Sequence, residues 1–364
     1  MFNLTFFKLF HNIDRILIIL IIFLIFTGLI TLTSATQGNL SIVGNQIVNI
    51  IIGLIILILL SNINPKSFLF YAPYLYVFSL LLLLSVIFFG FESHGAKRWI
   101  NILFFNLQPS EIIKITIPLM LAWLYHRFQD TIDYKIHFSA FIIILIPASI
   151  IYNQPDLGTA ILIFLSGFIV IFLAGLPIKF ILSSILIFIL SFPYLWSTLH
   201  LYQKNRILSL VDPTHDPLGA GYHSIQSMIA IGSGGLLGRG WSYGGQTQLN
   251  FLPETTTDFI FSVYGEEFGF LGVFGIFILY FFILYRCVDM AQGMQNTFSR
   301  LLAASLVFTL FSSIFVNIAM VSGIFPIVGA PLPFISYGGT SMVVSLTMIG
   351  IIMSLHSNKS LIAN

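Results

Sequence analysis

Charged residues are scarce in this sequence. Asp, Glu, Lys and Arg make up only 8% of its 364 residues, about a third of the share that is usual in soluble domains. The net charge is only +2 and Lys and Arg form no run, so a nucleic-acid-binding surface is excluded. The sequence also has no P-loop, no zinc-ligand spacing and no dinucleotide-binding glycine motif, which excludes the enzyme classes that depend on them.

Cysteine and processing signals are also nearly absent. The single cysteine, Cys287, allows no internal disulfide, and we expect it to pack at the inner end of a membrane span. The first apolar stretch is too long for the core of a signal peptide and has no clear small-x-small cleavage site. We therefore expect it to remain as the first span.

Long apolar runs make up much of the sequence. Hydrophobic residues make up 57% of the chain, the mean hydropathy is +0.99, and no charged side chain lies between Ile16 and Pro65. That distance holds two spans of about 20 residues and a polar hairpin. Hydropathy predicts an all-α integral membrane protein, a single polytopic domain over residues 1–364. The ten expected transmembrane helices are residues 16–33, 43–61, 69–90, 108–126, 138–152, 158–176, 180–197, 259–285, 301–322 and 338–355.

The positions of Lys and Arg predict the orientation. Every segment that we expect on the inner side carries at least one positive charge, whereas three of the five outer segments carry none. Because positive charge favours the cytoplasmic side and an even number of spans returns the chain to its starting side, we expect both termini to be cytoplasmic.

One connection is long. Residues 198–258 form an expected outer, extracytoplasmic loop between spans 7 and 8, and functional residues concentrate in such loops. Two further breaks, NQPDLGT (residues 153–159) and GIFPIVGAPLPFISYGG (residues 323–339), interrupt apolar runs on the same side. Irregular backbone at membrane depth is tolerated only where it is buried in protein or lines a wet cavity. The sequence therefore predicts one cavity that opens to the outer side.

Acidic residues gather where the long loop meets span 8. Asp258 lies at this boundary, where reduced contact with water would suit a general base. The alternative is that Thr256, Thr257 and Asp258 simply cap the following helix. Glu266 and Glu267 would lie deep in lipid without partners, so we expect at least one of them to be buried against polar groups.

Other charges near the spans are also candidates. Glu111 and Lys114 are three residues apart at the start of span 4, so they share a helical face and either form an ion pair or bind substrate. Outer loops usually avoid positive charge. Lys97 and Arg98 therefore require an anionic partner such as a phosphate, and Arg239 could join them.

These features describe an outward cavity for a lipid-linked anionic substrate. Two classes stay open: an enzyme that acts on a lipid diphosphate, and a transporter of such a lipid. A transporter needs polar groups along its whole path, whereas most candidates lie at the outer end. Arg286 and Asp289 are the inner residues that a transporter would have to use. We favour the enzyme.

Several long motifs, in order, resemble the SEDS family of shape, elongation, division and sporulation proteins: GAKRWIN, LQPSEIIK, QPDLGTA, FLPETTTDFIFSVYGEE and PLPFISYGGTS. The resemblance covers nearly the whole chain. The segments DPLGAGYHSIQS and TQLNFLPE, together with a short C-terminal tail, are similar to sequences of the elongation branch rather than those of the division branch.

The resemblance implies a bacterial inner-membrane, multi-pass peptidoglycan glycosyltransferase that polymerises lipid II for cell-wall elongation and rod shape. It implies a class B penicillin-binding protein transpeptidase and the elongation machinery as partners. Asp258 falls on the aspartate of the family that is thought to be catalytic, and Arg98, Glu111 and Lys114 fall on family motif positions. Thr256 stands where the family usually has histidine, so no histidine role is expected there.

A divalent cation, Mg²⁺ or Mn²⁺ with unknown ligands, is expected to act with Lys97, Arg98 and Arg239 on the diphosphate. No organic cofactor is expected. The alternatives are a lipid II flippase, the division-specific polymerase of the same family, and a scaffold without catalytic activity.

Overall fold

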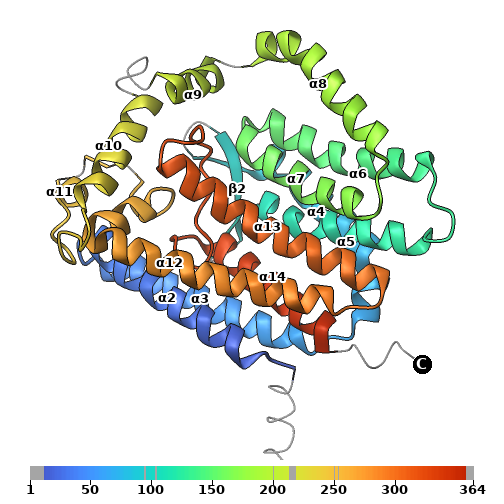
Figure 1. The fold of residues 1–364 in the computed structure, drawn as a ribbon, viewed down its shortest axis with the longest axis horizontal. Coiled ribbons are helices and arrows are strands. Elements are labelled where there is room, and N and C mark those ends of the chain that lie inside the picture. Colours follow the sequence, from blue (N-terminus) through green and yellow to red (C-terminus); the bar gives the residue numbers. More distant parts are fainter. Residues whose placement is uncertain are drawn as a thin grey trace, which may run out of the picture.

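The computed structural model describes residues 12–93, 96–102, 105–199, 201–212, 219–249, 251–252 and 254–357. This part of the chain is nearly all helical (Figure 1). Its helices are α2 (Arg15–Ala35), α3 (Leu40–Ser61), α4 (Pro65–Phe89), α5 (Pro109–Arg127), α6 (Tyr134–Asn153), α7 (Leu157–Leu173), α8 (Ile178–Thr198), α9 (Leu201–Val211), α10 (Ala220–Ser233), α11 (Gly245–Gln248), α12 (Ile260–Gln292), α13 (Thr297–Val321) and α14 (Gly339–Ser357).

The structure confirms a helical protein with several membrane spans. Seven of the described helices are long and apolar enough to cross a membrane: α2, α3, α4, α6, α12, α13 and α14. The other three expected spans correspond to α5, α7 and α8, which are not among these seven. Helix α7, for example, has only 17 residues. The number of ten spans therefore stays a prediction.

One local expectation needs correction. The chain is not purely α-helical, because β1 (Phe91–Ser93), β2 (Ala96–Ile102) and β3 (Phe105–Leu107) form a small antiparallel sheet in the order β1-β2-β3. Residues such as Trp99 and Ile100 favour strands, and the pairing provides partners for the backbone beyond α4. The connection at residues 198–258 contains helices α9, α10 and α11.

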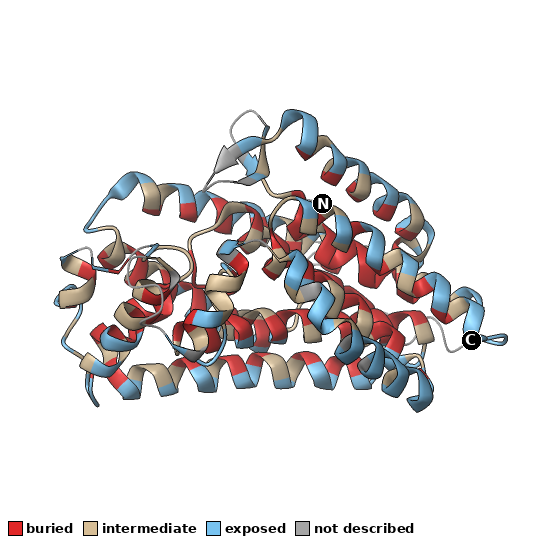
Figure 2. Cartoon of the chain, turned by 90° about the horizontal axis from the view of Figure 1, so that it is seen from above, coloured by how far each residue is buried: buried red, intermediate tan, exposed pale blue. Residues whose placement is uncertain are grey.

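Close packing between helices depends on small residues. Helices α3 and α14 pack extensively. At Gly53 of α3 an added Cβ would lie 2.5 Å from Leu346 Cδ1, and at Gly350 of α14 it would lie 2.8 Å from Leu57 O. Such small residues let two membrane helices approach closely, which dispersion forces require in lipid. Figure 2 shows buried residues on the inward faces of the bundle and exposed residues on the outward faces.

An ion cluster ties the start of α2 to the end of α12. Asp14 Oδ2 accepts hydrogen bonds from Arg286 Nη2 at 2.7 Å and Nε at 3.1 Å, and Arg286 Nη1 donates to Asp289 Oδ2 at 2.9 Å. Because Asp258 immediately precedes α12, these charges lie at the opposite end of this helix. Arg286 pairs with both carboxylates, and its bond to Asp14 links the two helices.

We expect Asp14→Asn to destabilise the protein by about 1–2 kcal/mol at pH 7, because hydrogen bonds to a charged partner are lost. Burial raises the pKa of Asp14, but the hydrogen bonds and charge of Arg286 outweigh burial and hold this pKa below its ordinary value of 3.8. A carboxyl with a lowered pKa stabilises the fold above its unfolded pKa and loses this effect as the pH falls through its folded pKa. The difference between the two proteins should therefore shrink below pH 3.8.

Thermal unfolding in detergent at several pH values measures this effect. The matched control is Asp289→Asn, since the Asp289 side chain is 53% exposed and its removal should cost less. Equal stability of wild type and Asp14→Asn at pH 7 would contradict the assigned role.

Candidate functional site

The predicted breaks in the apolar runs meet at residues 328–329, between α13 and α14. Gly329 has φ +78°, a left-handed conformation that favours glycine, and an added Cβ there would lie 3.3 Å from Asp258 Oδ2. Val328 precedes Gly329 in the chain. A Cβ added at Gly158, in the first turn of α7, would lie 2.0 Å from Val328 Cγ1. Asp258 and the 153–159 break therefore lie close to adjacent residues of a single loop.

Three successive carbonyl groups hold the segment before α12. Tyr337 N–H donates to Thr256 O at 2.9 Å, and Ser336 Oγ donates to Thr257 O at 2.6 Å. The Asn317 side chain in α13 donates through Nδ2 to Asp258 O at 3.0 Å and to Ala330 O at 2.6 Å. Because these donors come from α13 and the loop that follows it, the backbone of Asp258 is positioned by distant residues.

The structure places the N-cap of α12 one residue beyond the segment TTTD. The residue at the N-cap of α12 is Phe259, which makes no side-chain cap hydrogen bond. Thr257 Oγ1 instead donates to Glu254 Oε2 at 3.1 Å. Asp258 is half-buried, with its carboxylate next to Gly329.

Arg98 links the small sheet to the α6–α7 connection. Its Nη2 donates to Pro155 O at 2.7 Å, and its Nε lies 3.4 Å from Asp156 Oδ2. Asp156 is buried and caps α7, because it also accepts a hydrogen bond from Thr159 N–H at 3.1 Å. The Arg98 side chain keeps 27% of its surface exposed. Lys97, its neighbour on β2, is exposed.

Glu111 and Lys114 form the ion pair that their spacing predicts. Lys114 Nζ donates to Glu111 Oε1 at 2.5 Å, and both residues are only 5% exposed. The start of α5 is fastened to α14, because Gln108 N–H donates to Thr340 Oγ1 at 3.1 Å. The two charges thus neutralise each other inside the bundle, and a direct contact with substrate stays a prediction.

Helix α3 contributes to the same loop. Gln46 Nε2 donates to Ser336 O at 3.1 Å, and Gly338 N–H donates to Gln46 Oε1 at 3.2 Å. The loop that positions Asp258 is therefore held by α3 on one side and by α13 on the other.

Glu266 and Glu267 are buried against polar partners, as expected, and they bind the long connection. Glu266 accepts hydrogen bonds from Gln246 N–H at 2.9 Å and from Thr247 N–H at 3.3 Å. Glu267 accepts from Ser242 N–H at 3.1 Å and from the Ser34 hydroxyl group of α2. Both carboxylates thus replace water as acceptors for backbone donors near the start of a membrane helix.

Arg239 belongs to the same region rather than to the Arg98 side. Its N–H donates to Glu266 O at 3.0 Å, and its exposed side chain donates through Nε to Ser233 O at 3.2 Å. The described contacts therefore place Arg98 beside the α6–α7 connection and Arg239 beside α10 and α12. The expected joining of Lys97, Arg98 and Arg239 into one cluster is not what these contacts show.

Sequence reasoning missed three residues at this site: Asn317, Ser336 and Gly329. An amide within an apolar span is itself a signal, because polar groups in membrane helices need a partner, and Asn317 lies in the last two turns of the apolar helix α13. Ser336 and Gly329 lie in a glycine- and proline-rich loop, where no periodic pattern distinguishes one position from another.

An apolar groove lies between α6 and α7. It has a volume of about 680 Å³, and its outer end includes Tyr152 and Leu157. These two residues flank the 153–156 segment that Arg98 contacts. Ala148 and Phe164 also line the groove. It has the dimensions and apolar character of a site for a hydrocarbon chain.

The part of the chain that the structure describes contains no group of three or more His, Cys, Asp or Glu residues that could hold a metal ion. Mg²⁺ usually binds through one or two carboxylates together with water and substrate phosphates. The side chains present do not make a complete protein site for the expected divalent cation.

The comparisons with known proteins agree on one family. The model of the FtsW/RodA/SpoVE family, described as "Cell cycle protein", matches residues 9–361. Peptidoglycan glycosyltransferase MrdB of Escherichia coli (strain K12) is 42% identical over 360 residues, which cover 99% of this chain and 97% of that protein. The probable peptidoglycan glycosyltransferase FtsW of Trichlorobacter lovleyi is 35% identical over 79% of this chain and 76% of its own length.

Solved structures show the same similarity. A chain from a peptidoglycan synthase complex, studied for the coordination of polymerization and crosslinking, has a TM-score of 0.82 and 31% identity over 95% of this chain and 98% of its own. The rod shape determining protein RodA of Thermus thermophilus has a TM-score of 0.71 and 26% identity over 95% and 97%.

We expect Asn317→Leu to lower the free energy of unfolding by about 2–4 kcal/mol, because two carbonyl groups lose their donor while the volume is nearly kept. Thermal unfolding in detergent measures this. Ser313→Ala is the matched control on the same helix, since its hydroxyl bonds only to Thr309 O one turn earlier. An effect of Asn317→Leu no larger than that of the control would contradict the positioning role.

Proposed function

The chain belongs to the FtsW/RodA/SpoVE family and is a peptidoglycan glycosyltransferase, and from this premise we propose that it polymerises lipid II into glycan strands for cell-wall elongation. The higher identity to MrdB than to the FtsW relative, 42% against 35%, supports the elongation branch. The likeness to a rod shape determining protein supports a role in rod shape.

The observation that carries the mechanism is the position of Asp258 at the loop that joins the outer-side segments. Its backbone carbonyl accepts a hydrogen bond from Asn317, and its carboxylate lies beside Gly329. Gly329 leaves space beside the carboxylate that any larger residue would take. A sugar hydroxyl group can approach a carboxylate in such a position.

Asp258 acts as the general base. The 4-hydroxyl group of the acceptor sugar gives its proton to Asp258 while its oxygen attacks the anomeric carbon of the donor. The bond from this carbon to the polyprenyl diphosphate breaks, and the transition state has oxocarbenium character. General-base catalysis of this kind contributes about 10²- to 10⁴-fold.

The bases at this end of the bundle stabilise the diphosphate. Arg98 contacts residues 155–156, just before the Gly158 that packs on Val328, and keeps part of its surface exposed, and Lys97 is exposed next to it. Arg239 approaches from the α10 side, and the buried Glu111–Lys114 pair supports the wall made by α5. A divalent cation would add positive charge to the diphosphate, and its ligands would come mainly from the substrate.

The hydrocarbon tail of the substrate occupies the α6–α7 groove. The outer end of this groove lies beside the segment that binds Arg98, so a diphosphate near Arg98 places its polyprenyl chain at the groove. The apolar lining of the groove then takes the place of the membrane lipids that would otherwise contact the polyprenyl chain, and this chain buries no polar group of its own.

The proposed membrane arrangement has ten spans, in which α5, α7 and α8 join the seven long apolar helices. Both termini are cytoplasmic, and residues 198–258 lie outside the inner membrane. This arrangement places Asp258 on the outer side, where new peptidoglycan is made, and it treats residues 1–364 as one polytopic domain.

A class B penicillin-binding protein is the proposed partner, together with the elongation machinery. The support is the likeness to a chain of a complex that polymerises and crosslinks peptidoglycan. A lipid transporter is less favoured, because the inner charges Arg286 and Asp289 are bound in the cluster with Asp14.

We expect Asp258→Asn to abolish glycan polymerisation, because an amide cannot accept the proton. Purified protein, with and without the crosslinking partner, is incubated with lipid II, with and without Mg²⁺ or Mn²⁺, and glycan products are separated by electrophoresis. Glu254→Gln is the matched control, an exposed carboxylate in the same segment. An unchanged melting temperature shows that the fold is intact. Undiminished synthesis by Asp258→Asn would refute the base role.

We expect Ala148→Phe to lower kcat/KM for lipid II by about tenfold, since a larger side chain fills the α6–α7 groove and the tail loses apolar contact. The same polymerisation assay measures this at several lipid II concentrations. Ser139→Phe adds the same bulk to α6 at an exposed position outside the groove and should have little effect. Equal rates for the two variants would argue against a tail in this groove.

A further inference from the structure

A second cavity lies at the end of the bundle opposite Asp258. It has a volume of about 820 Å³ and lies between the start of α4, the end of α5 and the start of α13. This is the end at which α12 and α14 finish, because Ser354 Oγ donates to Ile63 O at 2.5 Å and His356 Nδ1 lies 3.3 Å from Met290 O. None of the residues of the proposed active site lines this cavity.

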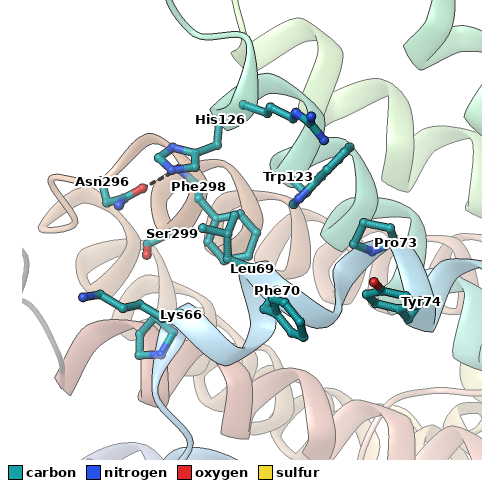
Figure 3. A pocket seen from close by; sticks show the side chains of 12 residues that line it. Lys66, Leu69, Phe70, Pro73, Tyr74, Trp123, His126, Asn296, Phe298 and Ser299 are labelled. Carbon is teal, nitrogen blue, oxygen red and sulfur yellow. Dashed lines mark hydrogen bonds between the residues drawn. The ribbon is translucent and has the colours of Figure 1, made fainter.

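The lining changes from polar to apolar along the cavity. Figure 3 shows Lys66, Asn296 and His126 toward one side and Tyr74 and Trp123 toward the other. The α4 residues that line it extend from Pro65 to Tyr74, a distance of about 13 Å along a helix. A cavity that begins at a helix end and reaches this far inward crosses from the headgroup level into the hydrocarbon region.

The polar side of the cavity is positively charged. Lys66 lines this side, Arg127 lines the cavity where the polar side meets the aromatic side, and none of the described lining residues is Asp or Glu. Two helices also begin there with their N-terminal N–H groups: Asn64 Oδ1 accepts from Lys66 N–H at 2.9 Å in α4, and Asn296 Oδ1 accepts from Phe298 N–H at 2.8 Å in α13. Helix N-termini carry partial positive charge and favour anions.

The apolar side is aromatic and open to the membrane. The Arg127 guanidinium lies 5.2 Å from the Trp123 ring, and Phe70 and Tyr74 are 64% and 65% exposed. Aromatic side chains at this depth pack against acyl chains near the headgroups. The Arg127 guanidinium therefore lies at the boundary between the polar and apolar parts of the cavity.

We propose that this cavity binds one anionic phospholipid from the membrane leaflet opposite Asp258. Its phosphate lies between Lys66 and Arg127, and the upper part of its acyl chains lies along Tyr74 and Trp123. Basic pockets between membrane helices are typical sites for anionic headgroups. Inorganic phosphate would use only the polar side, and a zwitterionic lipid would leave net positive charge uncompensated.

Native mass spectrometry of delipidated protein in detergent tests this, with dioleoyl phosphatidylglycerol as the probe and dioleoyl phosphatidylcholine as the comparison. We expect wild type to bind phosphatidylglycerol more tightly than phosphatidylcholine. The double variant Lys66→Gln, Arg127→Gln should bind phosphatidylglycerol about 30-fold more weakly, since the two bases contribute about equally to the free energy of binding an anionic headgroup.

The matched control is Arg15→Gln, Arg300→Gln, which removes two exposed positive charges from the same end outside the cavity and should change the affinity less than about twofold. Both double variants must show the melting temperature of wild type, and the two single cavity variants replace the double variant if it does not. Equal binding of the two lipids by wild type, an equal loss in the control, or displacement of phosphatidylglycerol by a large excess of inorganic phosphate would overturn the proposal.

Discussion

Every buried backbone polar group in a membrane protein needs a partner within the protein, and the proposed active site depends on how one loop meets this need. The segment before α12 and the loop before α14 are both irregular, so neither can satisfy its carbonyl groups within a helix. Asn317, Ser336 and the Tyr337 N–H satisfy three successive carbonyls across the two segments. The position of Asp258 is a consequence of this pairing.

The same constraint explains where the charges lie. Lys114 is paired with Glu111, Arg98 with Asp156, and Arg286 with Asp14 and Asp289. Glu266 and Glu267 accept hydrogen bonds from backbone N–H groups, which stabilises these carboxylates near the start of a membrane helix. Removal of one partner from a buried pair such as Glu111–Lys114 costs far more than the pair contributes, so these two residues stabilise the bundle only as a pair.

The two ends of the bundle differ in what they offer a lipid. At the Asp258 end, an apolar groove begins beside a base that already holds the α6–α7 connection. At the other end, a cavity combines two bases, two helix N-termini and aromatic side chains. The first arrangement suits a substrate that must leave after reaction, and the second suits a lipid that remains bound.

The sequence by itself determined the membrane class, the family, most helix positions and the Glu111–Lys114 pair, because hydropathy, turn residues and helical spacing act over a few neighbouring positions. It also identified Asp258, partly through motif resemblance. Only the tertiary structure decided that Asp258 lies beside Gly329, that Asn317 binds its carbonyl, and that Arg98 and Arg239 lie in different places. These contacts join residues that are distant in the chain, and helix packing, which local patterns do not encode, brings them together.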